Sequence, residues 1–104
     1  MDKSTPFFSV VIPTLNEEKY LPKLLRCLTQ QVDKDFEVIV VDAQSQDKTT
    51  AVANTFQDSL PLTVVVSAKH IISADWNIGA VQAAGDFLVF LDADVTIPTN
   101  FISE

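Results

Sequence analysis

Four short apolar segments divide the chain, and they constrain its fold more than any other feature. They are FSVVI (8–12), FEVIVV (36–41), LTVVV (62–66) and FLVFL (87–91). β-Branched and aromatic residues dominate these segments, and at least three of them are nearly continuous instead of alternating with polar residues. Strands that are buried on both faces have this composition. The segments therefore predict a parallel sheet of about four strands with helices on each side.

The gap after the first strand carries a helical pattern. Its apolar residues recur at helical spacing; they are Leu21, Leu24, Leu25, Leu28 and Val32. Pro22 cannot donate a backbone hydrogen bond and fits best in a first turn. The helix is therefore predicted to begin near Tyr20 and to leave LNEE as a loop above the first strand.

Two further helices are predicted between the remaining strands. The second covers about 47–57 and places Val52 and Phe56 on one face, and the third covers roughly 73–84 and stops at Gly85. Strands and helices then alternate along the whole chain. This order indicates a three-layer α/β/α domain with a mainly parallel sheet.

Length and charge exclude several classes of protein. The chain has 104 residues, enough for one domain, with 14 acidic and 7 basic side chains and a formal net charge of −7. This balance disfavours binding to nucleic acid. No apolar run approaches the ~20 residues of a membrane-spanning helix, and the N-terminus does not resemble a signal peptide. We expect a single cytoplasmic domain over residues 1–104, although a longer protein could associate with a membrane.

Polar segments follow three of the four predicted strands. PTLNEE follows the first strand, DAQSQDKT the second and DADVT the fourth. Because parallel strands share one direction, these segments converge at one edge of the sheet. Ligands of open α/β sheets bind at that edge, beyond the carboxyl ends of the strands. We therefore expect the functional site there.

Asp92 and Asp94 follow a buried strand directly. Two carboxylates in that position can both ionise readily only if they share a cation. Mg²⁺ and Mn²⁺ favour carboxylate oxygens and often complete their coordination with substrate phosphates. The pair therefore predicts a metal–diphosphate site, and a solvated turn is the alternative for this motif alone. In the second polar segment, Ser45 or Asp47 is predicted to cap the next helix, which leaves Asp42 without a role.

Four segments together resemble the nucleotide-binding half of family-two glycosyltransferases with the GT-A fold. They are VVIPTLNEEKYLPKLL, FEVIVVDAQSQDKT, WNIGAVQAAGD and FLVFLDADV, in the family's order and approximate spacing. The resemblance covers residues 9 to about 98. It implies the strand order 3-2-1-4 and a nucleotide-sugar-binding, Rossmann-like domain. It also implies an inverting transfer of sugar from a UDP- or GDP-linked donor to an acceptor in the intact protein.

The resemblance also implies roles for individual residues. Pro13, Thr14 and Glu17 would line the pocket for base and ribose, Asp42 would accept a hydrogen bond from the base, and Asn77 and Gly79 would pass beside the pocket. Asp92 and Asp94 would form the D-x-D motif, with Asp94 touching a Mn²⁺ or Mg²⁺ ion that bridges the diphosphate. The chain departs from the family pattern at Ala43 and Gln44, where many relatives have an acid and a glycine, and at Trp76, where many have arginine.

Only VTIPTNFISE follows the D-x-D motif, and its one acid, Glu104, lies at the chain end and is a poor candidate for the general base of an inverting transfer. We therefore expect a donor-binding half that is truncated after this motif, and we assign no catalytic residue. FLVFL would then lie at a sheet edge, with Phe87, Val89 and Leu91 insufficiently covered. Such an edge pairs readily with another copy, which predicts a homodimer through residues 87–102.

Two other functions fit parts of the sequence. VFLDADVT satisfies the D-x-D-x-T pattern of haloacid-dehalogenase-like phosphatases, in which Asp92 would be the nucleophile and Asp94 the general acid. That pattern normally opens such a fold, however, and no later lysine or acidic pair follows it here. The second alternative is a metal–nucleotide-binding module with no chemistry of its own.

Overall fold

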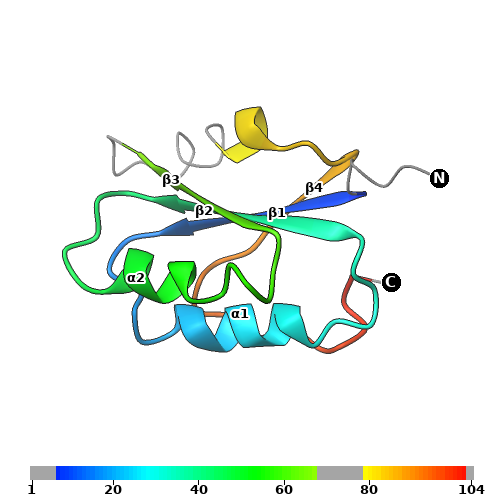
Figure 1. Ribbon diagram of the computed structural model, residues 1–104, viewed down its shortest axis with the longest axis horizontal. Coiled ribbons are helices and arrows are strands. Elements are labelled where there is room, and N and C mark those ends of the chain that lie inside the picture. Colours follow the sequence, from blue (N-terminus) through cyan, green and yellow to red (C-terminus); the bar gives the residue numbers. More distant parts are fainter. Residues whose placement is uncertain (1–6, 68–78, 103–104) are drawn as a thin grey trace.

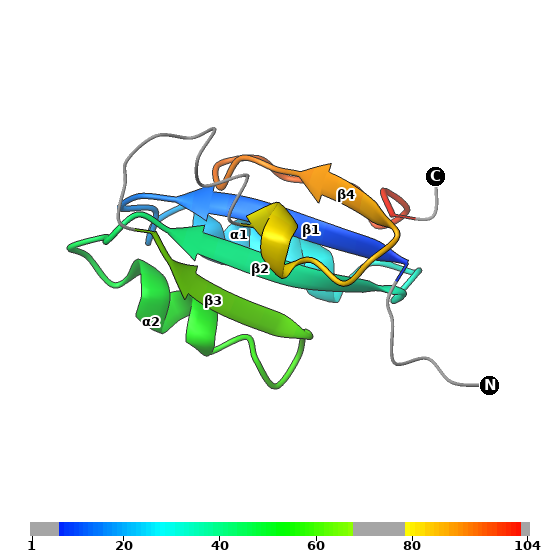
Figure 2. The same cartoon turned by 90° about the horizontal axis from the view of Figure 1, so that it is seen from above.

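The computed structural model describes residues 7–67 and 79–102 (Figure 1). Its elements are β1 (Phe8–Thr14), α1 (Leu21–Thr29), β2 (Phe36–Asp42), α2 (Thr49–Asn54), β3 (Leu62–Val66) and β4 (Phe87–Phe90). A further helical turn covers residues 79–82. The four strands form one parallel sheet in the order β3-β2-β1-β4, seen side by side in Figure 2. The predicted α/β fold, the parallel sheet and the strand order are confirmed.

Helices lie on both faces of the sheet. α1 and α2 cover one face, and the helical turn 79–82 lies on the other (Figure 1). Side chains of β1 and β2 alternate between a large core beneath α1 and α2 and a smaller cluster of Val11, Ile39 and Val41 on the opposite face. Burial on both faces explains why these two strands have nearly continuous apolar sequences.

Gly79 allows the turn 79–82 to lie close to the sheet. A Cβ atom at this position would lie 2.3 Å from Cγ1 of Val11, well inside van der Waals contact. The turn is followed by Gly85, whose N–H donates a hydrogen bond to the buried Ser9 hydroxyl (2.8 Å). A third helix was predicted over residues 73–84. Residues 79–82 of this range are helical, residues 83–84 are not, and residues 73–78 lie outside the described residues.

The first helix begins where the sequence predicted and ends earlier. Pro22 lies in its first turn, but α1 stops at Thr29, and Val32 is 69% exposed. Gln31 is buried instead: its Nε2 donates to the Pro98 carbonyl (2.6 Å) and its Oε1 accepts the Ile102 N–H (3.0 Å). The inclusion of Val32 in the helical face was therefore wrong, because contacts with the end of the chain terminate the helix.

The second helix is also shorter than predicted. α2 covers Thr49–Asn54 and continues as turns instead of helix, with Val52 and Phe56 half-buried. Lys48 occupies the N-cap position and makes no side-chain capping bond. Asp47 does accept the N–H of Thr49 (2.9 Å), whereas Ser45 bonds elsewhere, so Asp47 supports the helix start and Ser45 does not.

Candidate functional site

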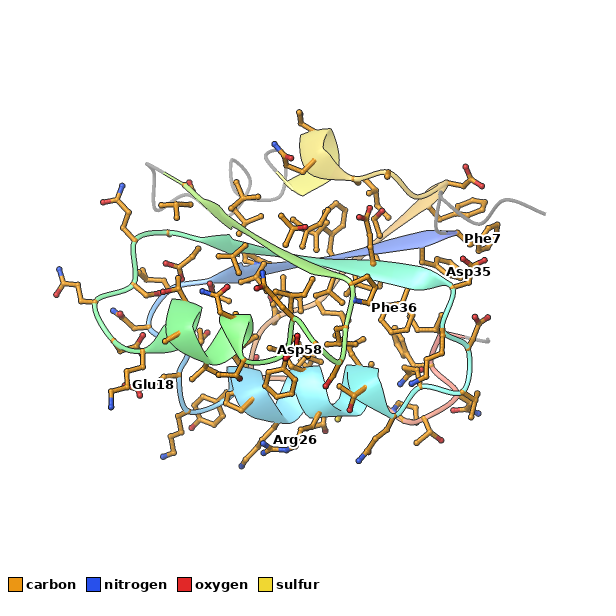
Figure 3. All side chains as sticks on the ribbon, viewed as in Figure 1. Phe7, Glu18, Arg26, Asp35, Phe36 and Asp58 are labelled. Atoms are coloured by element: carbon orange, nitrogen blue, oxygen red, sulfur yellow. The ribbon has the colours of Figure 1, made fainter. Side chains whose placement is uncertain are left out.

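The carboxyl ends of β1 and β2 lie side by side, and their last residues, Thr14 and Asp42, are register partners. The loops 15–20 and 43–48 leave the sheet together at this end (Figure 1). Figure 3 shows Glu18 here, at the opposite end of the sheet from Phe7 and Asp35. β4 joins the same end, because Leu91 donates its N–H to the Val11 carbonyl (3.0 Å) before the chain enters the D-x-D motif.

Asp42 is buried, and both of its carboxylate oxygens accept hydrogen bonds from its own chain. Its side chain is 1% exposed. Oδ1 accepts hydrogen bonds from the hydroxyls of Thr14 (2.7 Å) and Ser45 (2.6 Å), and Oδ2 accepts the Ser45 N–H (2.8 Å). These donors compensate the burial of a carboxylate and tie the ends of the first two strands together. Only Oδ2 keeps an acceptor position beyond these three bonds.

Further hydrogen bonds join the β1–α1 loop to the β2–α2 segment along their length. They are Ala43 N–H to Thr14 O (2.9 Å), Asn16 N–H to Ser45 Oγ (2.8 Å), Gln46 N–H to Asn16 Oδ1 (2.8 Å), Glu17 N–H to Thr49 Oγ1 (2.8 Å) and Glu18 N–H to Asp47 Oδ2 (3.2 Å). The two segments therefore form one cross-linked rim above the sheet.

Two residues of this rim adopt a left-handed backbone conformation. Asn16 has φ 56° and Gln44 has φ 60°. Asparagine tolerates this conformation, whereas it is unfavourable for glutamine. Glycine would adopt this positive φ at little cost, whereas the Cβ atom of Gln44 makes it strained. Nε2 of Gln44 donates to the Ser67 carbonyl (3.3 Å), so the side chain connects the rim to the end of β3.

Acidic side chains from three segments converge at this rim. Burial is the largest cause that raises the pKa of the Glu17 carboxyl, and repulsion by Asp94, Asp47 and Asp92 raises it further. Asp92 and Asp94 are exposed, while Ala93 between them is buried. The D-x-D motif thus faces the same space as Glu17, with its one apolar residue directed into the core.

Hydrogen bonds favour the anionic form of Asp47 within this cluster. Its burial alone would raise the pKa of the carboxyl group, but hydrogen bonds from the Thr49 hydroxyl, the Thr49 N–H and the Glu18 N–H outweigh this and lower the pKa. Together with Glu17, Asp92 and Asp94, this carboxylate makes the rim acidic. Such an arrangement favours a cation.

The side chains suit a divalent cation that also binds a ligand. Among residues 7–67 and 79–102, no group of three or more His, Cys, Asp or Glu side chains is arranged to hold a metal ion by itself. Asp92 and Asp94 supply hard carboxylate oxygens at an exposed position. Mg²⁺-type sites commonly use one or two carboxylates and leave the remaining positions to water and phosphate oxygens. The donor set therefore fits such an ion.

The structure brings most of the predicted site residues to one end of the sheet. Pro13 is half-buried in β1, Thr14 and Asp42 are buried beneath the rim, and Glu17 lies near the D-x-D motif. Gly79 packs against Val11, and Asn77 lies outside the described residues. The sequence interpretation gave no role to Asn16 and Thr49, although short polar side chains after adjacent strands are a signal for cross-loop hydrogen bonds.

Comparison with known proteins places this arrangement in a family. The sequence model of the family "Glycosyl transferase family 2" matches residues 9–104 of this chain. A PGL/p-HBAD biosynthesis glycosyltransferase of Mycobacterium bovis is 36% identical over 93 residues, which cover 88% of this chain and 36% of that protein. The chain thus spans about a third of the length of this relative. In the part that the structure describes, no helix is long and apolar enough to cross a membrane.

Solved structures give the same assignment. The crystal structure of TarS from Staphylococcus aureus has a TM-score of 0.89 at 35% identity and covers 93% of this chain and 18% of TarS. A mannosyltransferase from Pyrobaculum calidifontis, solved in complex with GDP-Man and Mn²⁺, has a TM-score of 0.83 at 29% identity, over 93% of this chain and 30% of that one. These matches favour the glycosyltransferase interpretation of DADVT over the phosphatase interpretation. The chain belongs to glycosyl transferase family 2.

Proposed function

We propose that residues 1–104 form a single nucleotide-sugar-binding domain that presents a sugar donor for transfer to an acceptor. The observation that carries the proposal is the convergence of Glu17, Asp47, Asp92 and Asp94, from three segments, at the carboxyl end of the sheet. In open α/β sheets this end is the usual ligand site. Carboxylates gathered there can bind a nucleoside diphosphate only through a cation, because both are anionic.

Asp92 and Asp94 would hold this divalent cation, with Asp94 in direct contact. When bound, a metal ion of this kind neutralises the charge that develops on a leaving nucleoside diphosphate. The mannosyltransferase complex with GDP-Man and Mn²⁺ supports the choice of Mn²⁺ or Mg²⁺. The exposure of both aspartates leaves room for phosphate oxygens on the same ion.

The base and ribose would lie on the rim next to this cation. Pro13, Thr14, Glu17, Asp42, Asn77 and Gly79 are the residues proposed for this part of the site. Structures of TarS with UDP and with UDP-GlcNAc, like the GDP-Man complex, support a UDP- or GDP-linked donor. A hydrogen bond from the base to Asp42 would have to use Oδ2, since both acceptor positions of Oδ1 are engaged by hydroxyls.

The donor-binding proposal has a direct test. UDP and GDP are titrated into the protein by calorimetry, first with Mn²⁺ and then with a chelator in excess. We expect one of the nucleotides to bind with Mn²⁺ and to lose most of its affinity when the metal is removed. If neither nucleotide binds at millimolar concentration in the presence of Mn²⁺, the proposal is wrong. A non-catalytic binding module would give the same binding and no transfer of sugar.

We also propose that the chain self-associates through residues 87–102. Phe87 is 55% exposed and Leu88 is 42% exposed on β4, the last strand at one side of the sheet. The prediction that Leu91 would be insufficiently covered is wrong, because the segment after β4 folds back and Leu91 is 9% exposed. Val89 is half-buried. Apolar exposure therefore remains at Phe87, Leu88 and Phe90 of β4 and at Phe101 in the segment that follows. A cytoplasmic location remains a prediction from composition.

A further inference from the structure

We infer that Thr49 is a positioning residue for Glu17 and, through Glu17, for donor binding. This inference rests on the proposed function of the rim. Thr49 is the first residue of α2 and lies on the segment after β2, whereas Glu17 lies on the loop after β1. The two residues are 32 positions apart in the sequence.

The hydroxyl of Thr49 connects the backbone of one segment to a carboxylate of the other. Oγ1 accepts the N–H of Glu17 (2.8 Å) and donates its own proton to Oδ1 of Asp47. The Thr49 N–H also donates to Oδ1 of Asp47 (2.9 Å). Both the donor and an acceptor position of the hydroxyl are thus used, which fixes its orientation.

The N–H groups of two consecutive residues in the β1–α1 loop, Glu17 and Glu18, are held by hydrogen bonds to the start of α2 and to Asp47 shortly before it. Thr49 accepts the N–H of Glu17, and Oδ2 of Asp47 accepts the N–H of Glu18 (3.2 Å). Fixing both peptide groups fixes the direction in which the Glu17 side chain leaves the backbone. The Glu17 carboxylate is therefore placed by hydrogen bonds that it does not make itself.

Electrostatic repulsion makes this restraint necessary. Asp94, Asp47 and Asp92 all act on the Glu17 carboxyl with the same sign of charge. In the absence of a cation, this repulsion favours movement of the loop away from the D-x-D motif. The hydrogen bonds of Thr49 and Asp47 oppose that movement. They keep the rim in the arrangement that a cation and a diphosphate require, so that binding does not have to order the loop first.

Thr49 cannot act on a ligand directly, because its side chain is 0% exposed. An effect of Thr49 on nucleotide affinity must therefore pass through its hydrogen-bond partners, which are the Glu17 N–H of the loop and the Asp47 carboxylate. This separates a positioning role from a contact with the donor. It also permits a test with substitutions that leave the charge of the site unchanged.

The test compares three variants of equal charge. Thr49→Val removes the hydroxyl at nearly constant volume, and Thr49→Ser keeps it. Thr55→Val is the matched control, because the Thr55 hydroxyl donates only to the nearby Val52 carbonyl (2.6 Å). Affinity for UDP or GDP with Mn²⁺ is measured by calorimetry, and hydrogen exchange of the Glu17 amide is measured by NMR without any ligand.

We expect Thr49→Val to weaken nucleotide binding roughly five- to tenfold, the effect of one lost hydrogen bond, and to accelerate exchange of the Glu17 amide. Thr49→Ser and Thr55→Val should retain affinity and protection close to those of the unsubstituted chain. If Thr49→Val does not fold, the pair Thr49→Cys and Thr49→Ser makes the same comparison, because a thiol is a much weaker hydrogen-bonding group.

The possible failures are distinguishable. Loss of Glu17 amide protection in Thr49→Val with unchanged nucleotide affinity would show that the hydrogen bond exists and does not position the site, which overturns this inference alone. Equal affinity and equal protection in all variants would overturn it as well. Absence of nucleotide binding by the unsubstituted chain would instead overturn the proposed function, and the positioning role with it.

Discussion

The hydroxyl of Thr14 lies 2.7 Å from the carboxylate of Asp42, and the two residues are register partners at the ends of β1 and β2. This bond joins the two central strands at their carboxyl ends, where both strands continue into the loops of the rim. The same carboxylate then accepts the N–H and the hydroxyl of Ser45. Asp42 is thus the connection between the core of the sheet and the rim that carries the acidic cluster.

Replacement of Asp42 should destabilise the fold. Asp42→Ala leaves Thr14 and Ser45 without their acceptor in a buried position, and unsatisfied or charge-assisted hydrogen bonds of this kind cost about 1.5–3 kcal/mol each. We expect the free energy of unfolding to fall by at least ~2 kcal/mol in urea titrations. Asp58→Ala, at an exposed position, is the control and should change little. A stable Asp42→Ala variant that only lost affinity for the base would assign Asp42 to the ligand alone.

Replacement of Asp94 should remove the metal dependence of nucleotide binding. Asp94→Ala deletes the carboxylate proposed to contact the cation, so Mn²⁺ should no longer increase the affinity for UDP or GDP. The expected loss is tenfold or more in the presence of Mn²⁺, which corresponds to about 1.4 kcal/mol per factor of ten. Asp86→Ala removes the same charge at an exposed position before β4 and should leave the metal dependence intact. Calorimetric titrations with and without a chelator provide the measurement.

Glu17 should make the metal-free chain less stable as pH rises. Burial, followed by repulsion from Asp94, Asp47 and Asp92, raises the pKa of this carboxyl in the folded state above its ordinary value of 4.5. Between these two pKa values the folded state binds more protons than the unfolded state, so the free energy of unfolding decreases with pH until the folded-state pKa is passed.

Glu17→Gln tests this pH dependence. We expect the variant to be more stable than the unsubstituted chain at pH 7 without metal, by roughly 0.2–1 kcal/mol, the range for interactions between accessible charges. Glu18→Gln, on the exposed neighbour, should not show the gain. Thermal unfolding between pH 4 and pH 8 distinguishes the two variants. An unchanged profile in Glu17→Gln would contradict the proximity of Glu17 to the D-x-D motif.

The 104-residue chain should not transfer sugar at an enzymatic rate. The chain spans only about a third of the length of the relative that it matches, and we assign no general base for an acceptor hydroxyl among its residues. Slow hydrolysis of a nucleotide sugar is expected with Mn²⁺, since a metal still assists the leaving group. Product formation from UDP- and GDP-sugars is followed with and without a sugar acceptor. Robust turnover on an acceptor would contradict this prediction.

Self-association should depend on β4. Leu88→Lys places a charge on an exposed position of this strand, and charged side chains on edge strands disfavour pairing with another strand. In sedimentation experiments the unsubstituted chain should form a dimer or larger species at high micromolar concentration, and the variant should shift toward monomer. Val81→Lys changes a residue that is 82% exposed on the helical turn and should have no such effect. A monomeric unsubstituted chain would refute the proposal.

The sequence alone was sufficient for the strands and for the end of the sheet at which the polar segments converge. Buried parallel strands require nearly continuous apolar segments, and β1 and β2 show them, with Ser9 and Glu37 as the polar residues near their starts. The sequence also placed Asp92 and Asp94 at this end of the sheet, because a strand end fixes where the next residues lie. The strand order 3-2-1-4, by contrast, followed from the resemblance to a family and not from any local pattern.

Only the tertiary structure determined how the site is held together. The bond from Glu17 to Thr49 joins residues 32 positions apart, and the bond from Asn16 to Ser45 joins residues 29 apart. Likewise, Gln31 and not Val32 is buried at the end of α1, because the segment 98–102 packs there. The periodicity of a sequence predicts which face of a helix or strand is apolar. It does not predict the burial of a polar side chain such as Gln31, because that burial depends on partners from a distant segment that satisfy its hydrogen bonds.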